Sequence, residues 1–185
     1  TTLFRSPDNG WPELLPFMFQ CVSSDSPKLQ ESAFLIFAQL SQYIGDTLAP
    51  HIKNLHAVFL QCLTSSSSSD VKIAALNAVI NFIQCLSSSA DRDRFQDLLP
   101  AMMTTLTEAL NNGNEVTAQE ALELLIELAG TEPRFLRRQL VDVVGSMLQI
   151  AEADGLEEGT RHLAIEFVIT LAEARERAPG MMRKL

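Results

Sequence analysis

The stretch ALNAVINF at residues 75–82 carries the pattern that decides the fold. Ala75 is followed by apolar residues one, four and seven positions later, namely Leu76, Val79 and Phe82. In an α-helix these positions share one face. A small side chain on that face lets two antiparallel helices approach each other closely. The stretch therefore predicts the second helix of a tightly packed helical hairpin.

The same pattern occurs four times along the chain. It returns as AFLIFAQL at 33–40, ALELLIEL at 121–128 and AIEFVITL at 164–171. The leading alanines at 33, 75, 121 and 164 are 42, 46 and 43 residues apart. Periods of about 40–47 residues are typical of HEAT and armadillo repeats, in which each repeat is a pair of helices.

These repeats predict an all-α protein, an α-α superhelix in the form of a right-handed solenoid of about four HEAT repeats and eight main helices. We expect a single array over 1–185, with repeats at about 9–44, 47–87, 92–130 and 133–177. Leu-Leu-Pro occurs at 14–16 and again at 98–100, and predicts bends in two first helices. Neither end of the chain resembles a polar cap, so we expect a fragment of a longer solenoid.

Composition excludes several classes of protein. Hydrophobic residues make up 46% of the chain and charged residues 20%, which excludes intrinsic disorder. The chain has 14 Lys and Arg against 23 Asp and Glu, and its net charge of −9 disfavours nucleic acid and favours basic partners. Most of this charge, −7, lies in 93–185. No apolar run is long enough to cross a membrane, so we expect no membrane partner.

No pattern of residues predicts catalysis. The three histidines and three cysteines lack zinc spacing, and neither a nucleophile motif nor a glycine-rich phosphate loop occurs. We therefore expect no enzymatic activity, no catalytic residue, no metal site and no cofactor. The cluster Arg134, Arg137 and Arg138 is interpreted as a helix surface paired with neighbouring glutamates.

The second helices suggest a binding face. Positions two and six after each leading alanine point away from the partner helix and carry amides in one hairpin and carboxylates in later ones. Amides can bind an extended backbone, and carboxylates can bind Lys and Arg. A plain solvated helix face is the alternative for each residue. Together with Glu120 on the same helix as two of them, we predict that these residues bind a basic cargo: Asn77, Asn81, Glu120, Glu123, Glu127 and Glu166.

Several separated stretches resemble the importin-β (karyopherin-β) superfamily, in its importin-β3 or importin-5 branch. They are FQDLLP at 95–100, AGTEPRFLR at 129–137 and HLAIEFVITLAE at 162–173, with NGWPEL at 9–14 and MMRK at 181–184 near the two ends. The resemblance implies a piece from the N-terminal third of a nuclear transport receptor that shuttles between cytoplasm and nucleus.

The resemblance also implies partners. They are basic cargo proteins, of the histone or ribosomal-protein kind, with their nuclear localisation signals, phenylalanine-glycine nucleoporins of the nuclear pore, and Ran-GTP, which releases cargo. Two other readings stay open. One is a HEAT-repeat scaffold subunit of a phosphatase or ligase complex, and the other is a HEAT-like enzyme that excises DNA bases, which the net charge of −9 disfavours.

Overall fold

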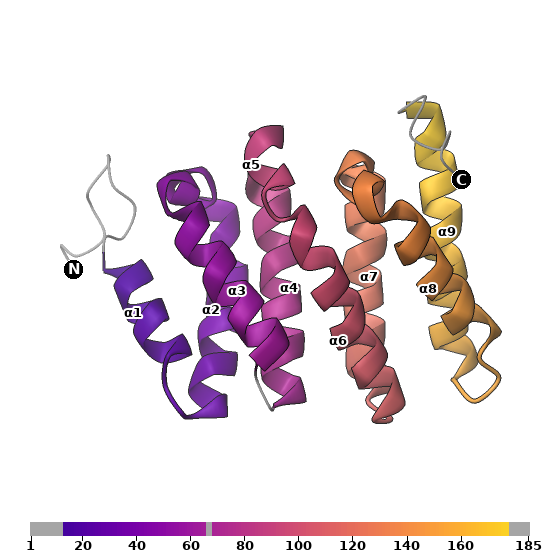
Figure 1. The fold of residues 1–185 in the computed structure, drawn as a ribbon, viewed down its shortest axis with the longest axis horizontal. Coiled ribbons are helices and arrows are strands. Elements are labelled where there is room, and N and C mark those ends of the chain that lie inside the picture. Colours follow the sequence, from indigo (N-terminus) through magenta and orange to yellow (C-terminus); the bar gives the residue numbers. More distant parts are fainter. Residues whose placement is uncertain (1–12, 66–67, 178–185) are drawn as a thin grey trace. The chain divides into compact units, whose positions relative to one another are not determined.

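The computed structural model describes residues 13–65 and 68–177, and the side chains up to residue 174. Within this part of the chain all regular secondary structure is helical, which confirms the predicted all-α fold (Figure 1). Eight of the α-helices have nine or more residues, as expected, and a ninth, α5, has five. The chain divides into two compact units, Thr1–Asp91 and Arg92–Leu185.

Unit 1 consists of two helical hairpins. In each hairpin a first helix packs on a longer second helix, and α2 packs along α4. Figure 1 shows α1 and α3 in one layer of this unit and α2 and α4 in the other. The elements are α1 (Leu14–Val22), α2 (Pro27–Ile44), the 3-10 helix η1 (Asp46–His51), α3 (Ile52–Ser65) and α4 (Ser69–Cys85).

Unit 2 repeats this arrangement. Its second helices α7 and α9 pack along each other, and α8 packs on α9. The first helices α6 and α8 form the other layer of the unit (Figure 1). The elements are the short α5 at the boundary (Ser89–Asp93), η2 (Gln96–Leu98), α6 (Leu99–Asn111), α7 (Glu115–Thr131), η3 (Pro133–Gln139), α8 (Leu140–Glu152) and α9 (Glu158–Arg177).

The four leading alanines are buried, as the pattern requires. Ala75, Ala121 and Ala164 are 0% exposed and Ala33 is 4% exposed. In α7 the residues one, four and seven positions after Ala121 are also fully buried. The alanine pattern therefore marks the packed side of each second helix.

The fourth copy of the pattern departs from this expectation. In α9, Ile165 is 44% exposed, whereas Phe167 and Leu171 are buried. The packed side of α9 is thus Ala164, Phe167, Leu171 and Ala174, at spacings of three and four. The reason is that α7 and α8 cover α9, and no further described helix of unit 2 lies over the side that carries Ile165.

The starts of the first helices differ from the prediction. Three 3-10 segments, η1, η2 and η3, lead into α3, α6 and α8, and the sequence analysis did not predict them. Pro100 is in the first turn of α6 and Pro16 is the third residue of α1. A proline in the first turn breaks no helical hydrogen bond, and the bends expected near Pro16 and Pro100 stay a prediction.

Candidate functional site

The candidate site is built first on α7. Glu120, Glu123 and Glu127 lie at spacings of three and four on one side of this helix, and all three are exposed. The opposite side of α7 is fixed by buried Ala121 and Leu125. No side chain of the three glutamates forms an ion pair or hydrogen bond with a residue that the structure describes. Three carboxylates are therefore free to bind cations.

Glu166 lies on α9 two residues after Ala164, the position that Glu123 has after Ala121 on α7. It is exposed, and α9 packs along α7. We call Glu120, Glu123, Glu127 and Glu166 the carboxylate face. Glu173, also exposed and two helical turns beyond Glu166, extends it along α9. Glu173 was not among the predicted residues, although its spacing of seven residues from Glu166 places both on the same side of a helix.

A polar link holds the starts of α7 and α9 together. The hydroxyl of Thr160, which is fully buried, donates to Glu115 Oε2 at 2.6 Å, and the Glu157 backbone N–H donates to the same oxygen at 2.9 Å. Gln119 Nε2 donates to Thr160 Oγ1 at 2.9 Å and to Glu157 Oε2 at 3.3 Å. These bonds fix the register in which α7 and α9 present their carboxylates.

The predicted amides lie in unit 1, apart from the carboxylate face. Asn77 and Asn81 are on α4 and are only partly exposed. Asn81 Nδ2 donates to the Asn77 backbone carbonyl at 2.8 Å, so part of its hydrogen-bonding capacity is used within the helix. Asn77 Oδ1 is buried and accepts no hydrogen bond from the described residues. The amides are thus less available to a ligand than the carboxylates.

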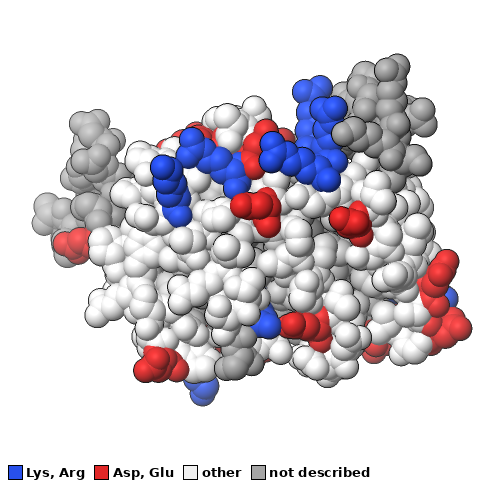
Figure 2. Space-filling view, viewed as in Figure 1, with Lys and Arg blue, Asp and Glu red and all other residues white. Residues whose placement is uncertain are grey.

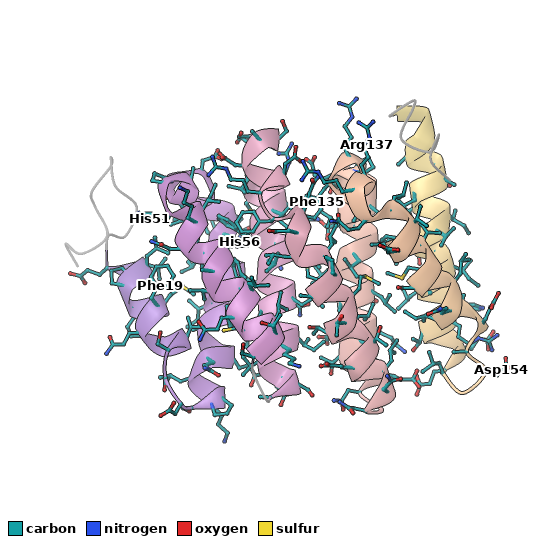
Figure 3. The ribbon with its side chains drawn as sticks, viewed as in Figure 1. Phe19, His51, His56, Phe135, Arg137 and Asp154 are labelled. Carbon is teal, nitrogen blue, oxygen red and sulfur yellow. The ribbon has the colours of Figure 1, made fainter. Side chains whose placement is uncertain are left out.

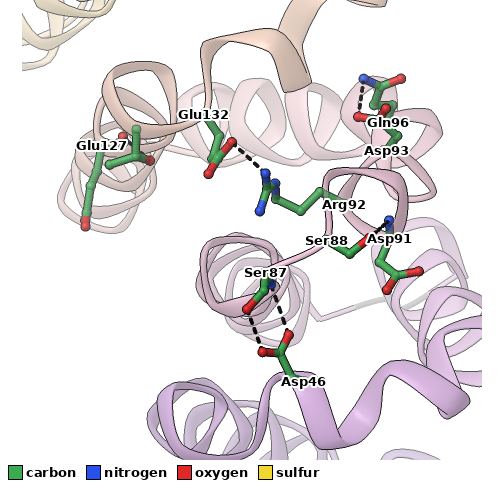
Figure 4. A network of polar contacts seen from close by, with 10 residues as sticks. Asp46, Ser87, Ser88, Asp91, Arg92, Asp93, Gln96, Glu127 and Glu132 are labelled. Atoms are coloured by element: carbon green, nitrogen blue, oxygen red, sulfur yellow. Dashed lines mark hydrogen bonds and ion pairs between the residues drawn. The ribbon is translucent and has the colours of Figure 1, made fainter.

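The carboxylate of Asp46 joins two segments of unit 1 that are far apart in the sequence. Asp46 Oδ2 accepts from the Ser87 hydroxyl at 2.6 Å, and Oδ1 accepts from the Ser87 backbone N–H at 3.0 Å (Figure 4). These bonds, the hydroxyl first, lower the pKa of Asp46 below its ordinary 3.8. Asp46 holds structure and is not part of the carboxylate face.

Two cysteines, Cys62 and Cys85, are not activated. Burial raises the pKa of Cys62 to about 11, and burial followed by the charge of Asp46 raises the pKa of Cys85. Both thiols are therefore protonated at neutral pH and are weak nucleophiles. Among the described residues no group of three His, Cys, Asp or Glu is placed to hold a metal ion. In the described part of the chain, no helix combines the length and the apolar character that a membrane span requires.

The arginine cluster differs from its interpretation as a paired surface. Arg134, Arg137 and Arg138 are exposed on η3 and form no ion pair with any residue in the described ranges. The neighbouring carboxylate of Glu132 pairs instead with Arg92 at 3.2 Å (Figure 4). The expected pairing is wrong because the nearest glutamate already has another partner.

Comparisons with known proteins agree with this architecture. Residues 2–183 match the family model described as IPO5-like, TPR repeats. The probable importin-5 homolog of Dictyostelium discoideum is 28% identical over 169 residues, covering 90% of this chain and 16% of that protein. Importin subunit beta-3 of Saccharomyces cerevisiae is 27% identical over 174 residues, covering 94% and 15%. The chain therefore spans about one-sixth of the length of these curated relatives.

The fold is that of a solved protein, Kap121p. A crystal structure of Kap121p, in a variant with lysine in place of three acidic residues, superposes with a TM-score of 0.79 at 24% identity, covering 98% of this chain and 17% of Kap121p. Kap121p has also been solved bound to Ste12p, Pho4p and Nup53p. This likeness shows the α-α superhelical fold. Because the family model covers nearly all of its residues, the chain belongs to the importin-5 (importin-β3) branch of the importin-β superfamily.

Proposed function

We propose that this chain is a cargo-binding segment of a nuclear transport receptor, and that its carboxylate face binds lysine- and arginine-rich segments of imported proteins. The observation that carries this proposal is the set of exposed carboxylates on α7 and α9, which form no ion pair with the residues that the structure describes. The importin relatives support a transport role. So does the structure of Kap121p bound to another protein, Pho4p.

The carboxylate face acts through charge and not through covalent chemistry. Several carboxylates in a row attract a basic segment from solution and accept charge-assisted hydrogen bonds from it. A single exposed ion pair contributes little, so affinity depends on several pairs forming together. Each hairpin contacts only its neighbours, and a small change in their packing alters the spacing of the carboxylates. Ran-GTP would release cargo through such a change, in a receptor that moves between cytoplasm and nucleus.

A crevice in unit 1 fits the nucleoporin part of this role. It lies among α1, α2 and α3 and is apolar throughout, with a free volume of about 10 Å³. Phe19 lies on the α1 side of this crevice (Figure 3). The side chain of a phenylalanine-glycine nucleoporin would enter if α1 moved outward from α3. The lining includes Leu15, Met18, Phe19, Leu55, Val58 and Phe59. Kap121p bound to Nup53p supports a nucleoporin partner.

A charge reversal tests the carboxylate face. In the triple variant Glu123→Lys, Glu127→Lys and Glu166→Lys, we expect the Kd for a histone-tail peptide to rise at least about tenfold. The matched control reverses three other exposed acids, Asp25, Asp142 and Glu152, and should change the Kd only a few-fold. Binding of the unaltered chain should weaken steeply with salt. Equal losses in both triple variants would contradict a specific face.

A second experiment separates a transport receptor from a scaffold. The chain would first bind a histone-tail peptide. A phenylalanine-glycine nucleoporin segment and then Ran-GTP would be added to this complex. A receptor segment retains the nucleoporin segment and loses the peptide when Ran-GTP is added. A scaffold subunit for a phosphatase or ligase complex retains neither nucleoporin nor Ran-GTP, and that result would favour the alternative.

A further inference from the structure

The η3 segment presents its arginines from a rigid base. Phe135 and Leu136 are 2% and 0% exposed and anchor this 3-10 helix in the core of unit 2. Arg134, Arg137 and Arg138 point outward and are exposed, and we call them the arginine edge. In a 3-10 helix, residues three apart share one side with a rise of about 6 Å between them. Arg134 and Arg137 are therefore stacked on the same side of η3.

The charge of the arginine edge is not neutralised within the described residues. Arg92, on α5, is paired with Glu132. The guanidinium groups of the arginine edge have no such partner in the part of the chain that the structure describes. Figure 3 shows Arg137 projecting away from the ribbon. Figure 2 shows Lys and Arg side chains, with Asp and Glu among them, on the same side of the molecule. A concentrated positive patch thus lies on a chain whose net charge is −9.

A hollow beside the arginine edge adds an apolar contact. It has a volume of about 360 Å³, and the described residues that line it are Arg137, Arg138, Leu140 and Val141. Val141, at the start of α8, is 58% exposed. Two guanidinium groups and two aliphatic side chains therefore border one space. A ligand that fits it combines anionic groups with a hydrophobic side chain.

We propose that the arginine edge and its hollow form a second docking surface, for an acidic protein segment whose carboxylates flank an aliphatic residue. Arginine binds carboxylates through paired hydrogen bonds and is enriched at protein interfaces. Nucleic acid is disfavoured, because three arginines on an acidic chain neutralise few phosphates, and none of the described residues that line the hollow is an aromatic residue for base stacking. This surface is opposite in charge to the carboxylate face and takes a different class of partner.

The test uses a labelled twelve-residue peptide of Asp and Glu around one central Leu, with fluorescence anisotropy as the readout. The chain should bind it, and Arg137→Glu with Arg138→Glu should weaken binding at least about tenfold. The matched control, Lys28→Glu with Lys53→Glu, makes the same change in total charge at two exposed positions and should weaken binding no more than about twofold. Val141→Ser should reduce the preference for Leu over Ala at the centre of the peptide.

Each outcome decides the proposal. Equal losses in the two double variants would show general charge attraction and overturn it. Tighter binding of a single-stranded oligonucleotide than of the acidic peptide, lost in the arginine variant, would assign the edge to nucleic acid and also overturn it. Binding of a histone-tail peptide should be unchanged or stronger in the arginine variant. That counter-probe separates failure of this proposal from failure of the carboxylate face.

Discussion

The two units share one helical pattern, but different contacts stabilise the inside of each unit. In unit 1 the hairpins meet at a cluster of phenylalanine rings, with the centroids of Phe37 and Phe59 at 5.7 Å and those of Phe37 and Phe82 at 5.5 Å. In unit 2 the corresponding core of α7 is aliphatic, and α7 and α9 are joined by the polar link from Glu115 to Thr160. The repeated small residue sets the packing of helices, and each unit then stabilises it differently.

The difference extends to the surface. The amides of α4 are partly buried and one donates within its own helix, whereas the carboxylates of α7 and α9 are exposed and unpaired among the described residues. The same helical positions therefore serve mainly for structure on α4 and are available for binding on α7. This comparison predicts that the two units respond differently to matched substitutions.

The largest effect is expected from the aromatic cluster of unit 1. Phe59 is 1% exposed and contacts Phe34, Phe37 and Phe82. Phe59→Ala should lower the free energy of unfolding by about 3–5 kcal/mol, because it removes buried surface and leaves a cavity. Phe59→Leu keeps most of the volume and should cost clearly less. Urea unfolding measures both, and a loss below about 1 kcal/mol for the alanine variant would contradict the role of the cluster.

A pair of glycines gives the next effect, with opposite signs in the two units. A Cβ on Gly45 would lie 2.8 Å from both Cβ and the backbone oxygen of Cys85, so Gly45→Ala should destabilise by about 1–3 kcal/mol. Gly145 on α8 has nothing within 4 Å of such a Cβ. Gly145→Ala should therefore stabilise by up to about 1 kcal/mol through helix propensity. Thermal and urea unfolding report both signs, and two changes of the same sign would be inconsistent with this packing.

The polar link of unit 2 should contribute less. Glu115→Gln removes the charged acceptor of the Thr160 hydroxyl and should cost about 1–2 kcal/mol in urea unfolding. Glu120→Gln, on the same helix but unpaired, is the matched control and should change stability by less than about 0.5 kcal/mol. If the two variants were equally stable, the link would not hold α7 to α9.

The smallest expected effect is the pH dependence of the stability that Asp46 contributes to unit 1. Because the pKa of folded Asp46 is lowered, its contribution to stability is present above pH 3.8, the ordinary value, and is lost as the pH falls through the lower folded value. Asp46→Asn should therefore have a lower Tm than the unaltered chain at neutral pH, and the difference should vanish in acid. A difference in Tm that stayed constant from neutral pH to pH 2 would rule out this titration.

Much of this architecture could be predicted because close helix packing requires a small residue at a repeated position. Ala75 and Ala121 are buried for that reason, and they identify the second helices. The short 3-10 helices before the first helices, such as η3, could not be predicted, since such short segments show no distinct period of apolar residues. The exposure of Ile165 and the link from Glu115 depend on which helix lies next to which. Periodicity within one helix does not contain that information.

The candidate site was only partly predictable for the same reason. A spacing of three and four residues places Glu120, Glu123 and Glu127 on one side of a helix, and the structure exposes all three. Sequence spacing does not distinguish an exposed side from a half-buried one, which is where Asn77 and Asn81 lie. The partners of charged residues are equally hidden, as the pairing of Glu132 with Arg92 shows.

The carboxylate face is tested most directly by locating a bound basic peptide. A lysine-rich peptide with a spin label at one end would be added to the isotope-labelled chain, and paramagnetic broadening of backbone amide signals would be recorded by NMR. We predict the strongest broadening around Glu123 and Glu127 on α7 and around Glu166 on α9, with little on α6 and α8. Broadening confined to the first helices, or spread evenly over the exposed acids of both units, would contradict the account.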